Sequence, residues 1–415
     1  MSILNKKTRR LVVVVGGGPV GLSVAALLSS NSKLEKFDVH LVDSGSAPTW
    51  FRDSLDLRVY ALSRVSQNIL NSLGVWESIT TCRSSPYEKM HVWQGKYDAR
   101  LGSVTFDSAE VGEPDLGHIV EDSLLRVELI KNLERAGVKI TFGAELSSID
   151  IRQREAHVTL STGEKLSAAI LIAADGGSST VRDLLEMPIT KVSYQQQAIV
   201  THIETEKSHG ETAWQRFLPD GPLAFLPLAD GRSSVVWSTK SNHAKTLCEL
   251  RDSEFRAKLQ SASGNVLGKI SSFTKRASFP LQASHAHQYC GNRVVLVGDA
   301  AHTIHPLAGQ GMNLGLMDAA VVADVLLEAL HKGEDPGDLR VLRRYERQRK
   351  GDNLKMLLAL DVLHRLFGVS GNLMPPLRSI GLSAFDAMPF VKSKIMRRAL
   401  GYRNQLPGAA INPIV

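Results

Sequence analysis

The sequence predicts an α/β protein in which a domain with a parallel sheet is interleaved with an antiparallel β-sheet region and followed by helices. Three observations predict this architecture. Short aliphatic runs, beginning with Leu11–Val15, lead into glycine turns and helical patterns, as parallel strands with crossover helices do. Residues 186–284 carry short β-rich runs separated by Pro-Asp-Gly and Ala-Asp-Gly turns, which indicates an antiparallel, α+β region. Residues 346–401 have helical apolar spacing.

The first strand and helix enclose the pattern Gly-x-Gly-x-x-Gly at Gly16, Gly18 and Gly21. Gly16 permits a tight turn, Gly18 lets the backbone approach a pyrophosphate, and Gly21 allows close helix packing. The helix N-terminus adds a positive dipole for the phosphates. Asp43 ends the next strand, where an acidic side chain accepts hydrogen bonds from an adenosine ribose. The pattern predicts a Rossmann-like dinucleotide site and does not decide between NAD and FAD.

Two later motifs follow further apolar strands. Asp175 lies in "LSAAILIAADGGSSTVR", and Asp299 lies in "GDAAHTIHPLAGQGMN", which runs into a long amphipathic helix. With the glycine pattern, these segments resemble the three FAD motifs of flavin-dependent aromatic hydroxylases of the hydroxybenzoate-hydroxylase type. "DLRVYALS", "GHIVED" and "TAWQRFLPDGPLAFLPL" narrow the resemblance to the ubiquinone-biosynthesis hydroxylases, from about residue 11 to about residue 401.

This resemblance implies a set of cofactor-binding residues. Asp299 matches the residue that holds a ribityl hydroxyl of FAD, and the backbone near Gly309, Gly311 and Asn313 matches the chain that approaches the flavin ring. The helix starting near Met312 would direct its positive end at that ring. Relatives usually carry Asn where this chain has Asp122. The full predicted set is Gly16, Gly18, Gly21, Asp43, Arg58, Asp122, Asp175, Asp299, Gly309, Gly311, Met312 and Asn313.

The two histidines of the third motif have alternative interpretations. On a helix, His302 and His305 would lie one turn apart and suit a metal, but Pro306 and the glycines predict a loop, so we expect no metal. His305 and Pro306 are the candidate catalytic residues, expected to position groups beside the flavin. Packing and hydrogen bonding are expected for His305, with direct proton transfer as the alternative. The resemblance implies noncovalent FAD.

The resemblance also implies the reaction. NADH or NADPH reduces FAD, O2 adds to form a C4a-hydroperoxide, and an electron-rich phenol attacks its distal oxygen. The implied substrate is a polyprenylated phenol of ubiquinone biosynthesis, and no separate nicotinamide domain is expected. A hydroxylase of a small soluble aromatic acid and a non-catalytic flavoprotein scaffold of a quinone-biosynthesis assembly remain as alternatives.

The domain prediction follows from these segments. A discontinuous FAD-binding domain is expected from residues 1–75, 100–185 and 285–345, and a substrate-binding sheet from residues 76–99 and 186–284. Residues 346–401 form a helical region, and residues 402–415 form a tail. Trp214, Phe217, Phe225 and Trp237 line the substrate pocket or, as the simpler interpretation, pack in the core.

Composition limits the setting of the protein. Three separated cysteines indicate reduced thiols and a cytoplasmic location, and no export signal or membrane span is visible. The net charge of +7 is compatible with scattered surface cations or with weak attraction to anionic lipid. The basic run Arg340–Lys350 is expected to be an exposed helix face, and no nucleic-acid module is found. Residues 354–368 are expected either to offer an apolar route into the pocket for a substrate that arrives from a membrane or a lipid-carrying partner, or only to pack against the FAD-binding domain. Peripheral contact with the inner face of a membrane and an oligomer are left open.

Overall fold

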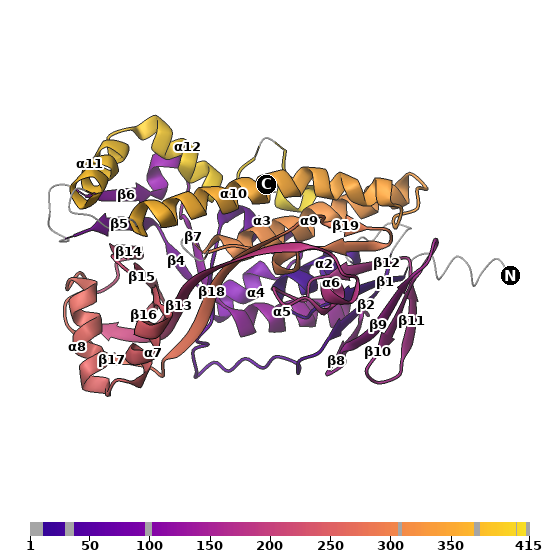
Figure 1. Ribbon diagram of the computed structural model, residues 1–415, viewed down its shortest axis with the longest axis horizontal. Helices are drawn as coiled ribbons and strands as arrows, with labels where there is room; N and C mark the ends of the chain where they lie inside the picture. The colour runs from indigo at the N-terminus through magenta and orange to yellow at the C-terminus, as the bar shows by residue number, and fades with distance from the viewer. Residues whose placement is uncertain are drawn as a thin grey trace.

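The computed structural model describes residues 11–29, 37–95, 102–305, 309–368, 374–403 and 405–411. The molecule is elongated, with a parallel sheet at one end and a large antiparallel sheet at the other (Figure 1). Helix α10 (Leu339–Gly368) extends along one side of both parts (Figure 1). The predicted mixed α/β architecture is confirmed.

The parallel sheet forms the core of the first part. Its strand order is β19 (Cys290–Gly291), β20 (Val294–Leu296), β12 (Ile170–Ala173), β1 (Leu11–Val15), β2 (Asp38–Asp43) and β8 (Lys139–Phe142), and only the β19–β20 pair is antiparallel. The central strands β1, β12 and β20 are aliphatic and buried on both faces, as parallel strands covered by helices are, whereas the edge strand β8 is partly exposed.

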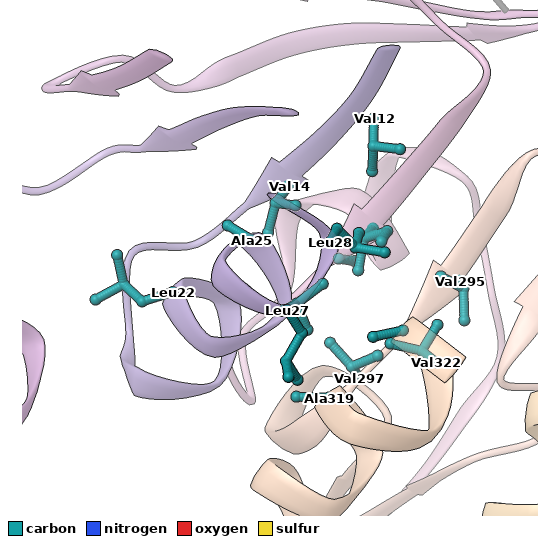
Figure 2. Packing of buried hydrophobic residues seen from close by; sticks show 14 of the residues in the cluster. Val12, Val14, Leu22, Ala25, Leu27, Leu28, Val295, Val297, Ala319 and Val322 are labelled. Atoms are coloured by element: carbon teal, nitrogen blue, oxygen red, sulfur yellow. The ribbon is translucent and has the colours of Figure 1, made fainter. Parts of the chain in front are cut away.

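Helices α2 (Pro19–Ser29) and α9 (Gln310–His331) pack against each other beside β1. Figure 2 shows Leu27 of α2 pointing toward Ala319 of α9, with Val14 and Val297 in the same cluster. Helix α5 (Asp122–Arg135) packs against α2 as well. Two segments that are far apart in sequence are thereby brought side by side, because α2 ends at Ser29 and α9 begins at Gln310.

The antiparallel sheet has the order β21 (His302–Thr303), β18 (Ala277–Ala286), β13 (Ile189–Thr205), β16 (Ser233–Lys240), β15 (Gly221–Pro227), β14 (Thr212–Leu218), β5 (Lys89–Gln94) and β6 (Ser103–Asp107). Strand β17 (Ile270–Phe273) pairs with β13, and β14 pairs in parallel with β5. Strand β6 thus belongs to this sheet, although residues 100–185 were assigned to the FAD-binding part. Two small sheets complete the fold: β3 (Val59–Leu62), β7 (Gly117–Glu121) and β4 (Ser85–Tyr87), and β9 (Leu146–Ile151), β10 (Ala156–Leu160) and β11 (Lys165–Ala168).

One face of the antiparallel sheet packs against α7 (Ser241–Glu249) and α8 (Asp252–Ser263). Phe225 and Trp237 are buried in that cluster, and Trp214 packs against it. Phe217 stacks on Phe367 of α10, with ring centroids 3.6 Å apart. The simpler interpretation of these four aromatic residues, core packing, is therefore confirmed.

The C-terminal part consists of α10, α11 (Met374–Asp386) and α12 (Pro389–Ala399). Helix α10 continues through the predicted boundary at residues 345 and 346 without a break. The prediction that Arg340–Lys350 is an exposed face is wrong for part of the run, because Tyr345 and Arg349 are buried. Helices α3 (Arg64–Ser72), α4 (Trp76–Cys82) and α6 (Thr180–Leu184) cover other edges. Within the ranges given above, no helix has the length and apolar character needed to cross a bilayer.

Candidate active site

A cavity of about 930 Å³ lies where the carboxyl ends of the parallel strands face the antiparallel sheet. The ends of β1, β2, β12 and β20 contribute Val15, Asp43, Ala174 and Val297 to its wall. Ligands of open α/β sheets bind at this edge, because the strand ends and the following helix N-termini converge there. The opposite wall comes from the antiparallel sheet and its neighbours, with Tyr87, Met90, Ala213, Gln215, Pro222, Ala224, Leu226, Val236 and Ser238.

The three glycines of the first motif have the predicted steric roles. Gly16 has φ +112°, and a Cβ there would lie 2.3 Å from the carbonyl oxygen of Ala174. A Cβ on Gly21 would lie 2.0 Å from the carbonyl oxygen of Gly16, which fixes the close approach of α2 to the turn. Gly18 has no protein atom within 4 Å of a Cβ position and lines the cavity. The turn therefore leaves open space for a ligand only at Gly18.

Asp43 ends β2 and also lines the cavity. Its Oδ2 accepts a hydrogen bond from the backbone N–H of Gly17, and its Oδ1 accepts one from Gly45 at 2.7 Å. The carboxylate thus ties the glycine turn to the end of β2. A second lone pair on each oxygen remains for the ribose contact that the sequence predicts.

Arg58, Tyr60 and Asp122 form a connected group on another part of the wall. The hydroxyl of Tyr60 donates to Oδ1 of Asp122 at 2.6 Å, and the guanidinium of Arg58 lies 5.4 Å from the centre of the Tyr60 ring. Asp122 is the first residue of α5, where the helix dipole favours a negative charge. The additional charge relative to Asn is therefore accommodated by Tyr60, by the helix terminus and by Arg126, whose Nη1 lies 3.9 Å from Oδ2.

Asp175 and Asp299 line the cavity from the second and third motifs. Oδ2 of Asp175 accepts from the N–H of Val181 at 3.1 Å, whereas Oδ1 is buried with no hydrogen-bond partner among the described residues. Burial raises the pKa of Asp175. Burial also raises the pKa of Asp299, with His302 and Arg58 opposing it. Carboxylates held in this way need a hydrogen-bond donor, and a hydroxyl-rich cofactor supplies donors.

The third motif places Gly309, Gly311 and Met312 on the cavity wall at the start of α9. Gly309 precedes the helix with φ +60°. Asn313 is not on that wall, because its side chain is fully used inside the protein: Oδ1 accepts from the N–H of Ser63 and the hydroxyl of Ser66, and Nδ2 donates to Ala61 and Gly309. Asn313 thus fastens the start of α9 to the β3–α3 connection and positions the glycine loop.

His305 is not among the residues that line the cavity. It is buried against Tyr194 and His364, with ring centroids 4.8 and 4.7 Å away, and neither ring nitrogen has a hydrogen-bond partner within the described ranges. Burial, reinforced by His364, lowers the pKa of His305 to about 3. This geometry favours packing over proton transfer. Pro306 lies outside the described residues.

The sequence did not point to Asp318 of α9, a fully buried carboxylate beside this site that has four hydrogen-bond partners. Oδ2 accepts from the N–H of Gly298 at 3.1 Å and lies 2.5 Å from Nε2 of His302. Oδ1 accepts from Nε of Arg349 at 2.6 Å and from Nδ2 of Asn353 at 3.1 Å. Burial would raise the pKa of Asp318, but His302 and Arg349 hold it well below its usual range. The sequence signal that could have indicated Asp318 is an acidic residue among the apolar residues of the predicted helix.

The residues that line this cavity fit a dinucleotide. Gly18 and Gly176 leave open space where a Cβ would stand, Oδ1 of Asp175 has no hydrogen-bond partner among the described residues, and two helices begin at the cavity wall. A metal has no comparable site: in the part of the chain that is described, no three or more His, Cys, Asp or Glu side chains are grouped to hold an ion. His302 instead contacts Asp318, and His305 contacts aromatic rings.

Comparison with known proteins agrees with this geometry. The FAD binding domain family matches residues 9–356. The chain is 35% identical over 396 residues to the 3-demethoxyubiquinol 3-hydroxylase of Escherichia coli (strain K12), covering 94% of this chain and 98% of that protein. It is 34% identical over 431 residues to the mitochondrial ubiquinone biosynthesis monooxygenase COQ6 of Xenopus tropicalis, covering 93% and 92%. Ubiquinone hydroxylase UbiL of Rhodospirillum rubrum is 35% identical over 393 residues, with 94% and 89% covered.

The fold also matches a solved structure, p-nitrophenol 4-monooxygenase PnpA from Pseudomonas putida DLL-E4, with a TM-score of 0.78 and 19% identity over 95% of this chain and 98% of that one. At this identity the likeness concerns the fold alone. The alignments with these relatives cover nearly the whole of this chain and nearly the whole of each relative. The resemblance seen in the motifs is therefore confirmed. The chain belongs to the ubiquinone-biosynthesis hydroxylases, within the family that shares this FAD binding domain.

Proposed function

We propose that this protein is an FAD-dependent monooxygenase that hydroxylates the aromatic ring of a polyprenylated phenol in ubiquinone biosynthesis, with NADH or NADPH as reductant and O2 as co-substrate. The observation that carries the proposal is the continuity of one cavity, which joins the dinucleotide cradle to a mostly apolar sheet wall. A cofactor and an organic ring bound there share one space. The chain's similarity to the bacterial 3-demethoxyubiquinol 3-hydroxylase and to the mitochondrial ubiquinone biosynthesis monooxygenase COQ6 supports the same reaction class.

The chain's own residues bind and orient in this proposal. When bound and reduced, FAD supplies the electrons that activate O2. The Gly16–Gly21 turn and the N-terminus of α2 would hold the pyrophosphate, while Asp43, Asp175 and Asp299 would accept hydrogen bonds from ribose or ribityl hydroxyls. Gly309, Gly311 and Met312 line the cavity at the N-terminus of α9, whose dipole would favour negative charge on a bound, reduced flavin.

The sheet wall favours a neutral phenol over an aromatic acid. Its polar side chains, Tyr87, Gln215 and Ser238, are uncharged, and among the described lining residues the arginines, Arg58 and Arg126, belong to the dinucleotide side. Nε of Arg126 donates to the carbonyl of Gly17 in the glycine turn at 2.8 Å. A buried carboxylate requires a cationic partner. This wall therefore offers no cationic side chain to bind the carboxylate of a soluble hydroxybenzoate.

We further propose that the C-terminal helices rest on an anionic membrane surface from which the substrate enters. Among the described residues, ten of fifteen exposed large hydrophobic side chains lie between residues 354 and 395: Leu354, Leu358, Val362, Leu363, Leu366, Leu377, Ile380, Met388, Phe390 and Ile395. Residues 346–401 hold ten Lys or Arg and four Asp or Glu, a net of +6 out of the chain's +7. Apolar side chains with a basic surround suit an anionic bilayer.

Turnover tests the reaction. FAD-loaded protein is incubated with NADH or NADPH and O2, with a prenylated phenol in one arm and 4-hydroxybenzoate in the other, and products are identified by mass spectrometry. The proposal expects a gain of one oxygen on the prenylated phenol ring and little product from the acid. Hydroxylation of 4-hydroxybenzoate alone would establish the soluble-acid alternative. FAD binding with no nicotinamide oxidation for either phenol would favour the non-catalytic scaffold.

Vesicle binding tests the surface. Wild-type protein is expected to sediment with vesicles containing an anionic phospholipid and to sediment less with neutral vesicles. A Leu358→Ser, Val362→Ser variant is expected to lose most of this binding while keeping FAD, because both side chains are exposed. A Phe51→Ser variant is the matched control, since Phe51 is an exposed aromatic residue far from the C-terminal helices in sequence. Equal binding by all three proteins would mean that another partner covers this face, such as a protein of a quinone-biosynthesis assembly.

A further inference from the structure

Gln215 of β14 is a buried amide that opens into the cavity. The residue is 7% exposed and belongs to the sheet wall. No hydrogen bond of its side chain to a described residue is found. Two other buried amides have protein partners: Nε2 of Gln67 donates to Asp115, and Nδ2 of Asn353 donates to Asp318. The Gln215 side chain differs from them in having no partner among the described residues.

The residues beside Gln215 explain why it has none. In the sheet register it lies between Val92 of β5 and Ala224 of β15, and Ala224 in turn pairs with Val236 of β16. These side chains are apolar, and Ala224 is small enough to leave room above the sheet. Side chains alternate between the two faces, so the neighbouring Trp214 turns to the core cluster while Gln215 faces the cavity. A buried amide without a partner is costly. A ligand that enters the cavity can supply this partner.

We propose that Gln215 binds the hydroxyl of the phenol substrate and so orients the ring. This role rests on the proposed function. The hydroxyl is the one polar group that every phenol has, and it both donates and accepts, as does an amide. A neutral amide suits a neutral phenol, because it adds no charge to an apolar wall. Gln215 lines the same cavity as Gly309 and Gly311, so a ring held by Gln215 presents a defined carbon to the flavin.

Binding to the oxidised, FAD-loaded protein tests this role without turnover. Two ligands are compared, a prenylated phenol and the prenylated benzene that lacks the hydroxyl, by the perturbation of flavin absorbance. Wild-type protein is expected to bind the phenol about 10- to 100-fold more tightly than the benzene, the range for a buried hydrogen bond between neutral partners. In Gln215→Leu, which keeps the apolar volume but removes the amide, this difference is expected to fall to about twofold or less by the logic of a double-mutant cycle.

Two further variants keep the result interpretable. Gln153→Leu makes the same change at an exposed residue outside the cavity and should retain the wild-type ratio. Gln215→Glu keeps the shape of the side chain and should weaken phenol binding less than Gln215→Leu, because a carboxylate still accepts from the hydroxyl. FAD content and thermal midpoints of Gln215→Leu and Gln153→Leu should match those of wild type, since the Gln215 side chain makes no hydrogen bond to a described residue.

Turnover then separates this role from the general reaction. With the prenylated phenol, Gln215→Leu is expected to give less hydroxylated product for each NADH or NADPH consumed, because a misoriented ring does not meet the activated oxygen. A wild-type preference for the phenol that survives unchanged in Gln215→Leu would overturn the assignment of Gln215 and leave the proposed function standing. A wild-type protein that hydroxylates no phenol would overturn both.

Discussion

Asp318 provides the sharpest test of what holds the loop of the third motif, which contains Gly298 and His302. Its carboxylate is fully buried and joins Gly298 and His302 of the third motif to Arg349 and Asn353 of α10. In Asp318→Ala, the guanidinium of Arg349 stays buried and loses its principal anionic partner. Removing one partner of a buried ion pair costs about 3 to 5 kcal/mol, because the remaining charge is uncompensated. That is a large part of the 5 to 15 kcal/mol typical of a folded protein.

The matched control lies on the same helix. Glu328 of α9 accepts from Lys332 one turn later, and both side chains are about half exposed. Solvent screens such a pair, so Glu328→Ala should cost about 0.5 kcal/mol or less. Urea unfolding followed by circular dichroism and by flavin release should therefore give a lower midpoint for Asp318→Ala alone. A difference of less than about 1 kcal/mol between the two variants would refute the view that Asp318 is essential to the loop.

The pH dependence of this comparison has a definite sign. A carboxylate whose pKa is lowered in the folded protein contributes stability above its unfolded pKa of about 3.9 and loses it as pH falls toward the folded value. The stability gap between wild type and Asp318→Ala should thus be constant from pH 7 to about pH 5 and should narrow below about pH 4. A gap that narrows already near pH 6 would assign the effect to another group.

Three further outcomes follow from the cofactor cradle. Asp299→Ala should weaken FAD binding by about 1.5 to 3 kcal/mol, or one to two decades in Kd, measured by flavin titration of the apoprotein, and unchanged affinity would remove Asp299 from the site. Gly21→Ala should lower both the thermal midpoint and FAD content because its Cβ would lie 2.0 Å from a carbonyl oxygen, whereas Gly18→Ala should spare the midpoint and lower only FAD affinity. Acid precipitation should release all flavin into the supernatant, and flavin that stays with the pellet would show a covalent bond.

The parallel sheet and the positions of the three motifs were predictable because their signals are local. A run of aliphatic residues, a turn glycine and an amphipathic helix follow one another within a few tens of residues, and the crossover geometry then brings the strand ends to one edge. The steric reasons given for Gly16, Gly18 and Gly21 hold in the structure for the same reason. Each depends on the turn itself and on the strand next to it.

Contacts between distant segments were not predictable in this way. Arg349 stands in a basic run that has the composition of a solvated helix face, yet it is 3% exposed because α10 turns that position toward Asp318. Asn313 belongs to a motif that approaches the flavin, but its side chain is taken up by Ser63 and Ser66, far away in sequence. The sequence does not distinguish Gln215 from other polar residues of alternating strands. Its apolar neighbours, Val92 and Ala224, are defined only by the sheet register.

Helix α10 links the third motif to the protein surface, because one of its faces is buried against that motif and the other is exposed. On the buried face, Arg349 reaches Asp318, and further along the helix His364 packs against His305, so the same helix supports the third motif at two points. On the outer face, Leu358 and Val362 are exposed. A single helix that carries both faces would keep the proposed membrane-contact face in a fixed relation to the third motif. Substitutions on the outer face should consequently change substrate uptake and leave flavin affinity alone, whereas those on the buried face should change both.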